Sequence, residues 1–366
     1  MKSDLHLHSD WRRVGSWPPP IQWLALLALS TLISVLWAAA GLPAALLLGP
    51  MIGGIVFAAN GVRLTVPPVS YLAVQAVIGT MVAAAITPEI VSTFVHGAPL
   101  FSVVMTATLF GAALLGWFIS RTGLIPGATA VYGTSPGAAT TMVLLSEAEG
   151  GDALLVAFMQ YVRVLLVAVA AALVGRFWAN VPGAHSPGAS WLAPVNWGQL
   201  GVVLLAAAAG QQLARLLRLP AWGMLGPMLL LVTLHATGWL SIDLPRWLLT
   251  AAYAMLGWYI GLRFSRETLR HARQALPVVA GAALVLMAFC GLLAWCLTHF
   301  AHVDALTAYL ATSPGGLDSV AVIAASTPGV NLQFVLALQS VRLLFVIGLS
   351  PPITRFVVRF SPHLQN

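Results

Sequence analysis

Charged residues are scarce in this chain. Only 7% of its 366 residues are Asp, Glu, Lys or Arg, whereas 59% are hydrophobic. Ordinary soluble domains carry about 25% charged residues. Such a chain has too little polar surface to cover a globule in water, which excludes a soluble enzyme, a disordered regulator and a free nucleic-acid-binding protein. We therefore expect the lipid bilayer as its solvent and no direct contact with nucleic acid.

Cysteines and metal-ligand patterns are scarce as well. The two cysteines, Cys290 and Cys296, share one apolar segment, which excludes a disulfide framework and a cysteine-based zinc site. His299, His302 and Asp304 are residue types that bind metals, but they stand where a solvated interfacial loop is expected. The chain has no hydrolase, metalloprotease, P-loop or dinucleotide motif. The sequence predicts no enzyme, no cofactor and no metal.

Long apolar runs fill most of the chain. A membrane helix needs about 20 apolar residues, and Pro or Gly separates most of these runs. The sequence predicts an all-α polytopic membrane protein with about 10 to 12 membrane segments, drawn from apolar runs at 21–41, 43–60, 68–87, 99–119, 124–146, 153–175, 197–217, 220–239, 245–263, 277–299, 305–325 and 331–356.

Polar stretches divide the chain. Residues 1–20 form a polar N-terminal tail, and a stretch rich in Pro, Gly, Ser and Asn at 179–196 separates two halves. We expect membrane repeats at 21–178 and 197–358, joined by that linker loop, and a C-terminal tail at 359–366.

The two halves match at ordered positions with a nearly constant offset, which indicates an internal duplication. The matches are Leu42-Pro43 with Leu219-Pro220, Gly49-Pro50 with Gly226-Pro227, Gly79 and Glu89 with Gly257 and Glu267, Thr134–Gly137 with Thr312–Gly315, and Gln160 and Arg163 with Gln339 and Arg342.

Basic residues indicate how the halves are oriented. If every segment crosses the membrane, the densest basic loop, 263–273, lies outside. If 124–146 and 305–325 enter and return, the second half inverts and only Arg176 and Arg246 lie outside. The positive-inside rule prefers this inverted arrangement, which transporters often use, with both termini cytoplasmic. A different non-crossing segment in each half would also invert it. The inside residues are then Lys2, Arg12, Arg13, Arg63, Arg121, Arg215, Arg218, Arg263, Arg266, Arg270, Arg273, Arg355 and Arg359.

The tetrapeptide Thr-Ser-Pro-Gly occurs twice in mid-segment, at Thr134–Gly137 and Thr312–Gly315. Pro lacks an N–H donor and clashes with the preceding turn, so it breaks or begins a helix, and Ser before Pro suits an N-cap. We expect Ser135 and Ser313 to cap half-helices whose positive N-terminal ends attract an anion. A Pro kink that only adjusts packing is the alternative.

Two arginines, Arg163 and Arg342, stand deep inside apolar segments, each one turn after a glutamine, Gln160 or Gln339. An intramembrane arginine is costly and needs a partner, and Asp318 is the only carboxylate well inside an apolar segment. Two arginines against one acid predict a net positive centre that favours an anionic ligand. Alternatively, helix carbonyls hold each arginine and its role is purely structural.

Asp318 and Ser319 follow the second tetrapeptide and could bind a coupling H⁺ or Na⁺; alternatively, Asp318 serves only as an arginine partner. Thr140 stands at the matching position in the first half. The predicted solute contacts are Thr134, Ser135, Gly137, Gln160, Arg163, Thr312, Ser313, Gly315, Gly316, Gln339 and Arg342.

Three motifs carry a family resemblance: LPAALLLGPMIGG early in the first half, TSPGAATTM and TSPGGLDSVAVIAA late in the halves, and Q-x-x-R-[VL]-L after each. Together they resemble the AbrB-type family of duplicated bacterial membrane proteins, over about 21–358. The first copy departs from the second, because Gly137-Ala138 replaces Gly315-Gly316. A more distant similarity to cation/proton antiporters and bile-acid-type carriers implies a transporter fold with crossed, discontinuous helices.

The resemblance and the residues together predict a secondary transporter of a small, anionic solute in the bacterial inner membrane, coupled to H⁺ or Na⁺. The family is also labelled a transcriptional regulator or an ammonia monooxygenase. The first label leaves open a membrane regulator of gene expression that acts through a partner. The second would require a metal site. A homodimer is compatible with this plan.

Overall fold

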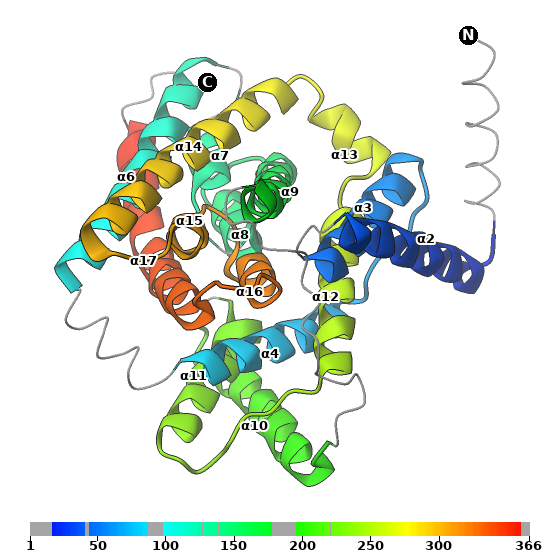
Figure 1. The fold of residues 1–366 in the computed structure, drawn as a ribbon. Helices are drawn as coiled ribbons and strands as arrows, with labels where there is room; N and C mark the ends of the chain where they lie inside the picture. Colours follow the sequence, from blue (N-terminus) through cyan, green and yellow to red (C-terminus); the bar gives the residue numbers. More distant parts are fainter. Residues whose placement is uncertain are drawn as a thin grey trace.

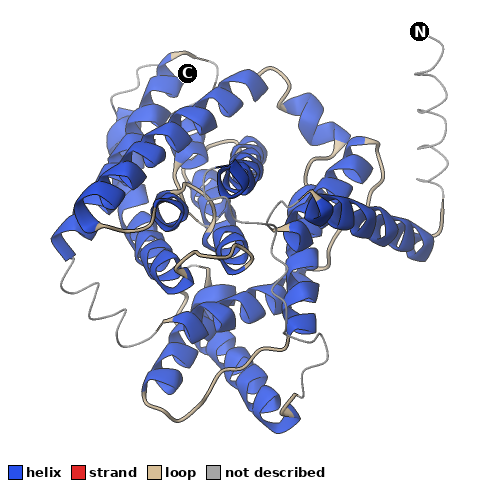
Figure 2. Cartoon of the chain, viewed as in Figure 1, coloured by secondary structure: helices blue, strands red, loops and turns tan. Residues whose placement is uncertain are grey.

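The structure is a computed structural model that describes residues 17–40, 44–86, 98–123, 125, 127–137, 139–177, 195–219 and 221–359. Every regular element in these residues is a helix and none is a strand (Figure 2), which confirms the all-α prediction. The helices are α2 (Pro19–Ala39), α3 (Ala45–Ala59), α4 (Pro68–Ala85), α6 (Ala98–Arg121), α7 (Gly127–Thr134), α8 (Ala139–Ala148), α9 (Ala153–Phe177), α10 (Trp197–Leu216), α11 (Trp222–Ala236), α12 (Arg246–Gly261), α13 (Arg266–His271), α14 (Leu276–Ala301), α15 (Ala305–Thr312), α16 (Leu317–Ala325) and α17 (Leu332–Arg359).

Four of the described helices are long and apolar enough to cross a membrane by length and composition: α2, α6, most of α9, and α14. Helices α3, α4, α11 and the first part of α17 are shorter and also apolar. The outward faces of the long helices expose large apolar side chains, such as Leu24, Phe110 and Trp295. Lipid covers such faces at little cost, so the protein is a multi-pass membrane protein in a bilayer.

The helix bounds follow the predicted apolar runs closely, with two differences. The segments predicted at 124–146 and 305–325 are each divided into two short helices, and α13 interrupts the loop expected after α12. Ser265 begins α13, because its hydroxyl accepts a hydrogen bond from the Thr268 N–H at 3.2 Å. Most of the predicted linker, both outer ends of the chain, and the matched Pro43, Pro220 and Glu89 lie outside the described residues.

The helices form two groups that lie side by side (Figure 1). The scaffold group contains α2, α3, α4, α10, α11 and α12. The broken-helix group contains α6 to α9 and α14 to α17, with α7, α8, α15 and α16 surrounded by the longer helices. The groups meet mainly where α16 and α17 approach α4 and where α16 approaches α3, and α13, which belongs to neither group, contacts both α3 and α9.

Glycines allow the scaffold helices to approach one another closely. A Cβ atom on Gly257 of α12 would lie 2.5 Å from the carbonyl oxygen of Leu47 on α3, and one on Gly261 would lie closer still to that of Met51. A Cβ atom on Gly54 of α3 would lie 3.2 Å from the Gly261 backbone. Small residues permit this backbone-to-backbone packing in membrane proteins, as expected for GPMIGG at 49–54.

One end of the scaffold group gathers the last turns of α3, α10 and α12 and the first turns of α4 and α11. Arg266 Nε donates to the Ala59 carbonyl at 3.2 Å. Gln211 Nε2 donates to the carbonyls of Leu72 and Gly223 at 2.9 and 2.7 Å. Tyr71 stacks on Tyr259 with ring centres 3.7 Å apart. Because these turns lead into basic connections, we call this the basic end; its arginines are Arg63, Arg215, Arg218, Arg263, Arg266, Arg270 and Arg273.

Replacing Gly261 tests the close packing of α3 and α12. Gly261→Ala places a methyl group against the Met51 carbonyl, so the helices must separate, at a cost of about 1–3 kcal/mol in the free energy of unfolding. The control is Gly281→Ala on α14, where a Cβ atom meets nothing within 4 Å and added helix propensity stabilises. The unfolding temperature in detergent should fall for Gly261→Ala and not for Gly281→Ala. Equal unfolding temperatures would contradict the packing.

Candidate functional site

The first broken segment is a helical hairpin. Helix α9 runs beside α7 in the same direction, because the Asp152 N–H donates to Thr129 Oγ1 at 2.9 Å near the start of both helices. Farther along, Gln160 Nε2 donates to the carbonyls of Tyr132 and Ser135 at 2.7 and 3.1 Å. Helix α8 joins the end of α7 to the start of α9, so it must run back along the hairpin.

The second broken segment repeats this geometry. The Asn331 N–H donates to Thr307 Oγ1 at 3.0 Å, near the starts of α17 and α15. Gln339 Nε2 then donates to the carbonyls of Leu310 and Ser313 at 2.8 and 3.2 Å. Helices α15 and α16 therefore form a second hairpin. The chain reverses direction in both segments, as an arrangement with two non-crossing segments requires.

The two serines end the first helix of each hairpin. The prediction that they cap the second helix is wrong. Ser313 is the C-cap of α15, with φ −52° and ψ 138°, and α16 begins after an extended Gly316 with no side-chain cap. The reason is Pro314, since a proline disfavours the helical conformation of the residue before it. The hydroxyls of Ser135 and Ser313 donate back to carbonyls of the helix that each one ends.

The threonines of both tetrapeptides fix the hairpin tips to neighbouring helices. Thr134 Oγ1 donates to the Ala112 carbonyl on α6 at 3.0 Å, and Thr312 Oγ1 donates to the Cys290 carbonyl on α14 at 3.0 Å. Both side chains are buried. The break in each helix therefore has a fixed position in the interior.

A buried arginine holds the first hairpin. Arg163 is 2% exposed; its Nη1 donates to the Ser135 carbonyl at 2.8 Å and its Nη2 to Gln160 Oε1 at 2.6 Å. The last carbonyls of a helix have no donor within it and form the negative end of the helix dipole. The guanidinium supplies both the donor and the opposite charge.

The second arginine makes equivalent contacts with the serine carbonyl and the glutamine of the second hairpin, and an additional one with a glycine carbonyl. Arg342 is 3% exposed. It donates to the Ser313 carbonyl, to the Gly315 carbonyl at 2.7 Å, and to Gln339 Oε1. In the described structure, the Nε atoms of Arg163 and Arg342 are buried without a hydrogen-bond partner. The structure therefore shows the carbonyl-held arrangement that the sequence left open. Both guanidiniums are charged at neutral pH.

The predicted coupling residues lie at the start of α16. Asp318 belongs to its first turn, but the Asp318 side chain, like that of Thr140, lies outside the described part of the structure. Ser319 is buried, and its hydroxyl donates to the Gly316 carbonyl at 3.1 Å.

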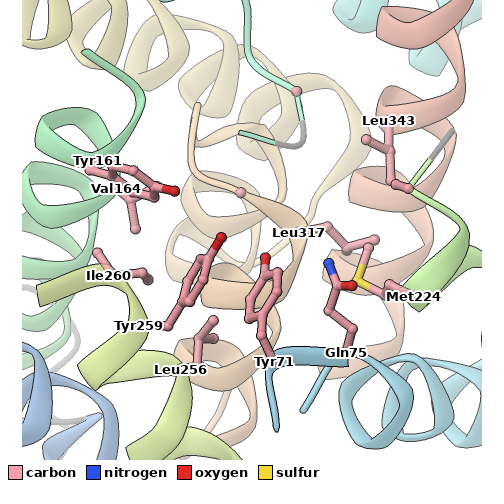
Figure 3. Close-up of a pocket in the computed structure, with 13 residues that line it drawn as sticks. Tyr71, Gln75, Tyr161, Val164, Met224, Leu256, Tyr259, Ile260, Leu317 and Leu343 are labelled. Atoms are coloured by element: carbon pink, nitrogen blue, oxygen red, sulfur yellow. The ribbon is translucent and has the colours of Figure 1, made fainter. Parts of the chain in front are cut away.

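A small cavity lies where both hairpins meet the scaffold group (Figure 3). Gly137 of the first tetrapeptide and Gly316 and Leu317 after the second all line it. Its volume is about 40 Å³, which holds a few water molecules or a small solute. The fold thus brings two motifs from different halves to one cavity. The other predicted solute contacts are buried and are not among the described residues that line this cavity.

Sequence reasoning missed the polar residues of the cavity wall. Tyr71 and Gln75 come from α4, Tyr161 from α9 and Tyr259 from α12. In Figure 3 the hydroxyls of Tyr71 and Tyr259 point the same way, and the Tyr161 hydroxyl points into the space from the facing helix. The only signal in the sequence was rarity, since the chain has 6 tyrosines and three of them line this cavity.

The residues considered for a metal have other contacts. Asp304 Oδ2 accepts hydrogen bonds from the N–H groups of Leu306 and Thr307 at 3.1 Å each and so caps α15. His299 stacks on Trp295 with ring centres 5.5 Å apart. Among the described residues, no three His, Cys, Asp or Glu side chains form a group that could hold a metal ion.

Comparison with known proteins identifies the family. The family model described as "Transition state regulatory protein AbrB" matches residues 46–358, a range that includes both hairpins and both arginines. The chain belongs to the AbrB family. The AbrB relative from Escherichia coli (strain K12), named "Putative regulator AbrB", is 43% identical over 345 residues, which cover 94% of this chain and 99% of that protein. An "Uncharacterized protein YhjN" of Bacillus subtilis (strain 168) is 28% identical over 280 residues, 72% of this chain and 71% of that protein.

Replacing Gln339 tests whether side-chain hydrogen bonds stabilise the second hairpin. Gln339→Leu removes the donor to the Leu310 and Ser313 carbonyls and the acceptor for Arg342. We expect the free energy of unfolding to fall by about 3 kcal/mol, because buried polar groups lose their partners. Ser340→Ala is the neighbouring control, since that hydroxyl donates to the Leu336 carbonyl of its own helix at 2.7 Å and otherwise makes a long 3.8 Å contact with Met228 Sδ. Thermal unfolding in detergent measures both; a loss no larger in Gln339→Leu than in the control would count against the role.

Proposed function

We propose that this AbrB-family protein is a secondary transporter of a small, anionic solute in the bacterial inner membrane. The cavity between the hairpins is its solute site. One observation carries the proposal: two hairpins from different halves, each unwound at Pro-Gly, line the same cavity. Unwound backbone at membrane depth is tolerated where it is buried in protein or lines a cavity. Transporters use discontinuous helices in this way.

Buried charge supports an anion as the solute. Arg163 directly precedes Val164, and Arg342 directly precedes Leu343; both following residues line the cavity. Arg342 donates to the carbonyl of Gly315, the residue before the lining Gly316, and the carbonyls that bind the guanidiniums carry no formal charge, so positive charge lies close to the cavity wall. Its effect is strong in an interior with a low dielectric constant. Asp318, next to the lining residue Leu317, is the proposed coupling acid, with Ser319 as a further contact for H⁺ or Na⁺.

Two features support an inverted duplication of 21–178 and 197–358. In both halves the arginine donates to the serine carbonyl of the tetrapeptide and to the glutamine one turn before it. The hairpins also enter from opposite ends. Helix α9 begins near the basic end, where Phe158 packs against Phe264 with ring centres 6.0 Å apart. Since α7 begins beside α9, the open end of the α7–α8 hairpin faces the basic end. Helix α14 leads away from the basic end, so the open end of the α15–α16 hairpin faces the opposite end of the molecule. Inverted repeats of this kind permit alternating access.

Orientation can be measured by labelling single cysteines. The basic end is proposed as cytoplasmic, by the positive-inside rule. In a background with Cys290 and Cys296 replaced by Ala, Arg270→Cys should react with an impermeant maleimide only in inverted membrane vesicles. Ser241→Cys, which lies beside Gln199 at the opposite end, should react only in right-side-out vesicles. The reverse pattern would contradict the orientation, and labelling of both positions from one side would contradict the fold.

Filling the cavity tests transport. In proteoliposomes, we expect the full-length protein to move at least one solute from a panel of carboxylates, amino acids, phosphate, ammonium and alkali cations. Leu256→Phe adds bulk to the cavity wall and should reduce that flux at least tenfold. Leu284→Phe, at a position 55% exposed on α14, makes the same change outside the cavity and should leave flux unchanged. No flux above empty liposomes for any solute would contradict the proposal.

A membrane regulator is the second candidate, favoured by the printed name of the Escherichia coli relative. On this reading the cavity senses a solute and a partner protein carries the signal to gene expression. Binding that Leu256→Phe abolishes, in a protein that shows no flux, would favour the regulator. Binding together with flux would favour the transporter.

A further inference from the structure

Arg263 occupies a special position among the arginines of the basic end. It follows α12 in an exposed turn, and its guanidinium carbon lies 4.7 Å from the centre of the Tyr259 ring. Tyr259 in turn stacks on Tyr71, with ring centres 3.7 Å apart and planes 9° from parallel. Cation–π contact of this kind holds an arginine head group over the ring face. Arg263 therefore touches solvent on one side and the tyrosine pair on the other.

The tyrosines connect Arg263 to the cavity. Tyr71 and Tyr259 both line it, as does Tyr161 from the broken-helix group. Burial lowers the pKa of Arg263, but the phenols of Tyr161, Tyr259 and Tyr71 raise it, and the net shift is upward. Arg263 is thus a cation held against Tyr259, one of the three tyrosines of the cavity wall. The structure places an exposed positive charge directly against a residue of the cavity wall, and positive charge near a cleft steers and concentrates anions.

The cavity wall has a polar and an apolar part. The polar part consists of the three phenols and the Gln75 amide; the apolar part includes Met224, Leu256 and Leu317. Figure 3 shows the phenol hydroxyls on the side of the cavity away from the α12 backbone and Leu256. A small inorganic anion would leave the apolar part unfilled, whereas a carboxylate with a short apolar body contacts both parts.

We infer that Arg263, held over Tyr259, selects anions at the mouth of the cavity, and that the solute is a small organic monocarboxylate. Its charged group meets Arg263 and the phenols, and its apolar body lies against Leu256 and Leu317. The inference rests on the proposed solute site and adds to it a residue that sets charge selectivity. This residue is separate from the two buried arginines, whose contacts hold the hairpins.

The test is ligand-induced thermal stabilisation of the full-length protein in detergent at constant ionic strength. The probes are acetate, pyruvate, butyrate and benzoate, the neutral amide of each, and inorganic phosphate. A ligand that binds the native state stabilises it by RT ln(1 + [L]/Kd), so at a fixed ligand concentration a tighter ligand raises the unfolding temperature more. We expect at least one carboxylate to stabilise the protein and its amide to have no effect. Arg263→Gln should raise the apparent Kd for that carboxylate at least tenfold, and Arg263→Lys by less.

Arg270→Gln is the matched control, because it removes the same charge from an exposed position on α13 and should leave the Kd unchanged. Arg263 is only partly buried, and loss of a cation–π contact at such a site costs little stability, so without ligand its variants should unfold close to the wild-type temperature. Equal effects of a carboxylate and its amide, stabilisation by phosphate alone, or wild-type affinity in Arg263→Gln would overturn the inference. If one of these outcomes is found but Leu256→Phe abolishes binding of the ligand that stabilises the protein, the role of Arg263 fails and the proposed solute site stands. If no probe binds and no flux is found, the site fails too.

Discussion

A buried guanidinium bonded to the open end of a broken helix is the interaction on which the rest of the structure depends. Proline ends α7 and α15 inside an apolar body, where unpaired carbonyls cost several kcal/mol and no lipid group can pair with them. Arg163 and Arg342 donate to those carbonyls, and Gln160 and Gln339 bridge each arginine to the same helix end. Without these donors the chain could not turn back in the interior, and the glycine backbone could not face a cavity.

Each of the two groups of helices forms one wall of the cavity. Glycine packing between α3 and α12 and between α10 and α11 makes the scaffold group a close-packed wall. The hairpins supply the facing wall, with the buried Arg163 and Arg342 bonded to the backbone that forms it. The groups share few contacts outside α4, α13, α16 and α17, so the cavity lies at the junction that can change most easily. This location suits the proposed alternating access, since transporter halves rock around a fixed site.

Sequence patterns predicted the helices well because hydropathy and Pro or Gly punctuation are local. The run predicted at 153–175 and the observed α9 at Ala153–Phe177 differ by two residues at one end. The short α13 has no apolar run and was missed. Ser313 was assigned to the wrong helix, since the effect of Pro314 on the residue before it outweighed the capping pattern. The partners of the arginines could not be predicted, because backbone carbonyls have no sequence signature. The tyrosine residues of the cavity wall were missed for another reason: they come from α4, α9 and α12, which are distant in the sequence.

The meeting of both hairpins at one cavity can be tested directly by cross-linking. Gly137→Cys and Leu317→Cys would be combined in the cysteine-free protein, with a protease site inserted between residues 179 and 194. After treatment with a short bifunctional maleimide and cleavage, the two halves should remain joined on a denaturing gel. Separation of the halves, although mass spectrometry shows that both thiols reacted, would contradict a shared cavity and with it the proposed solute site.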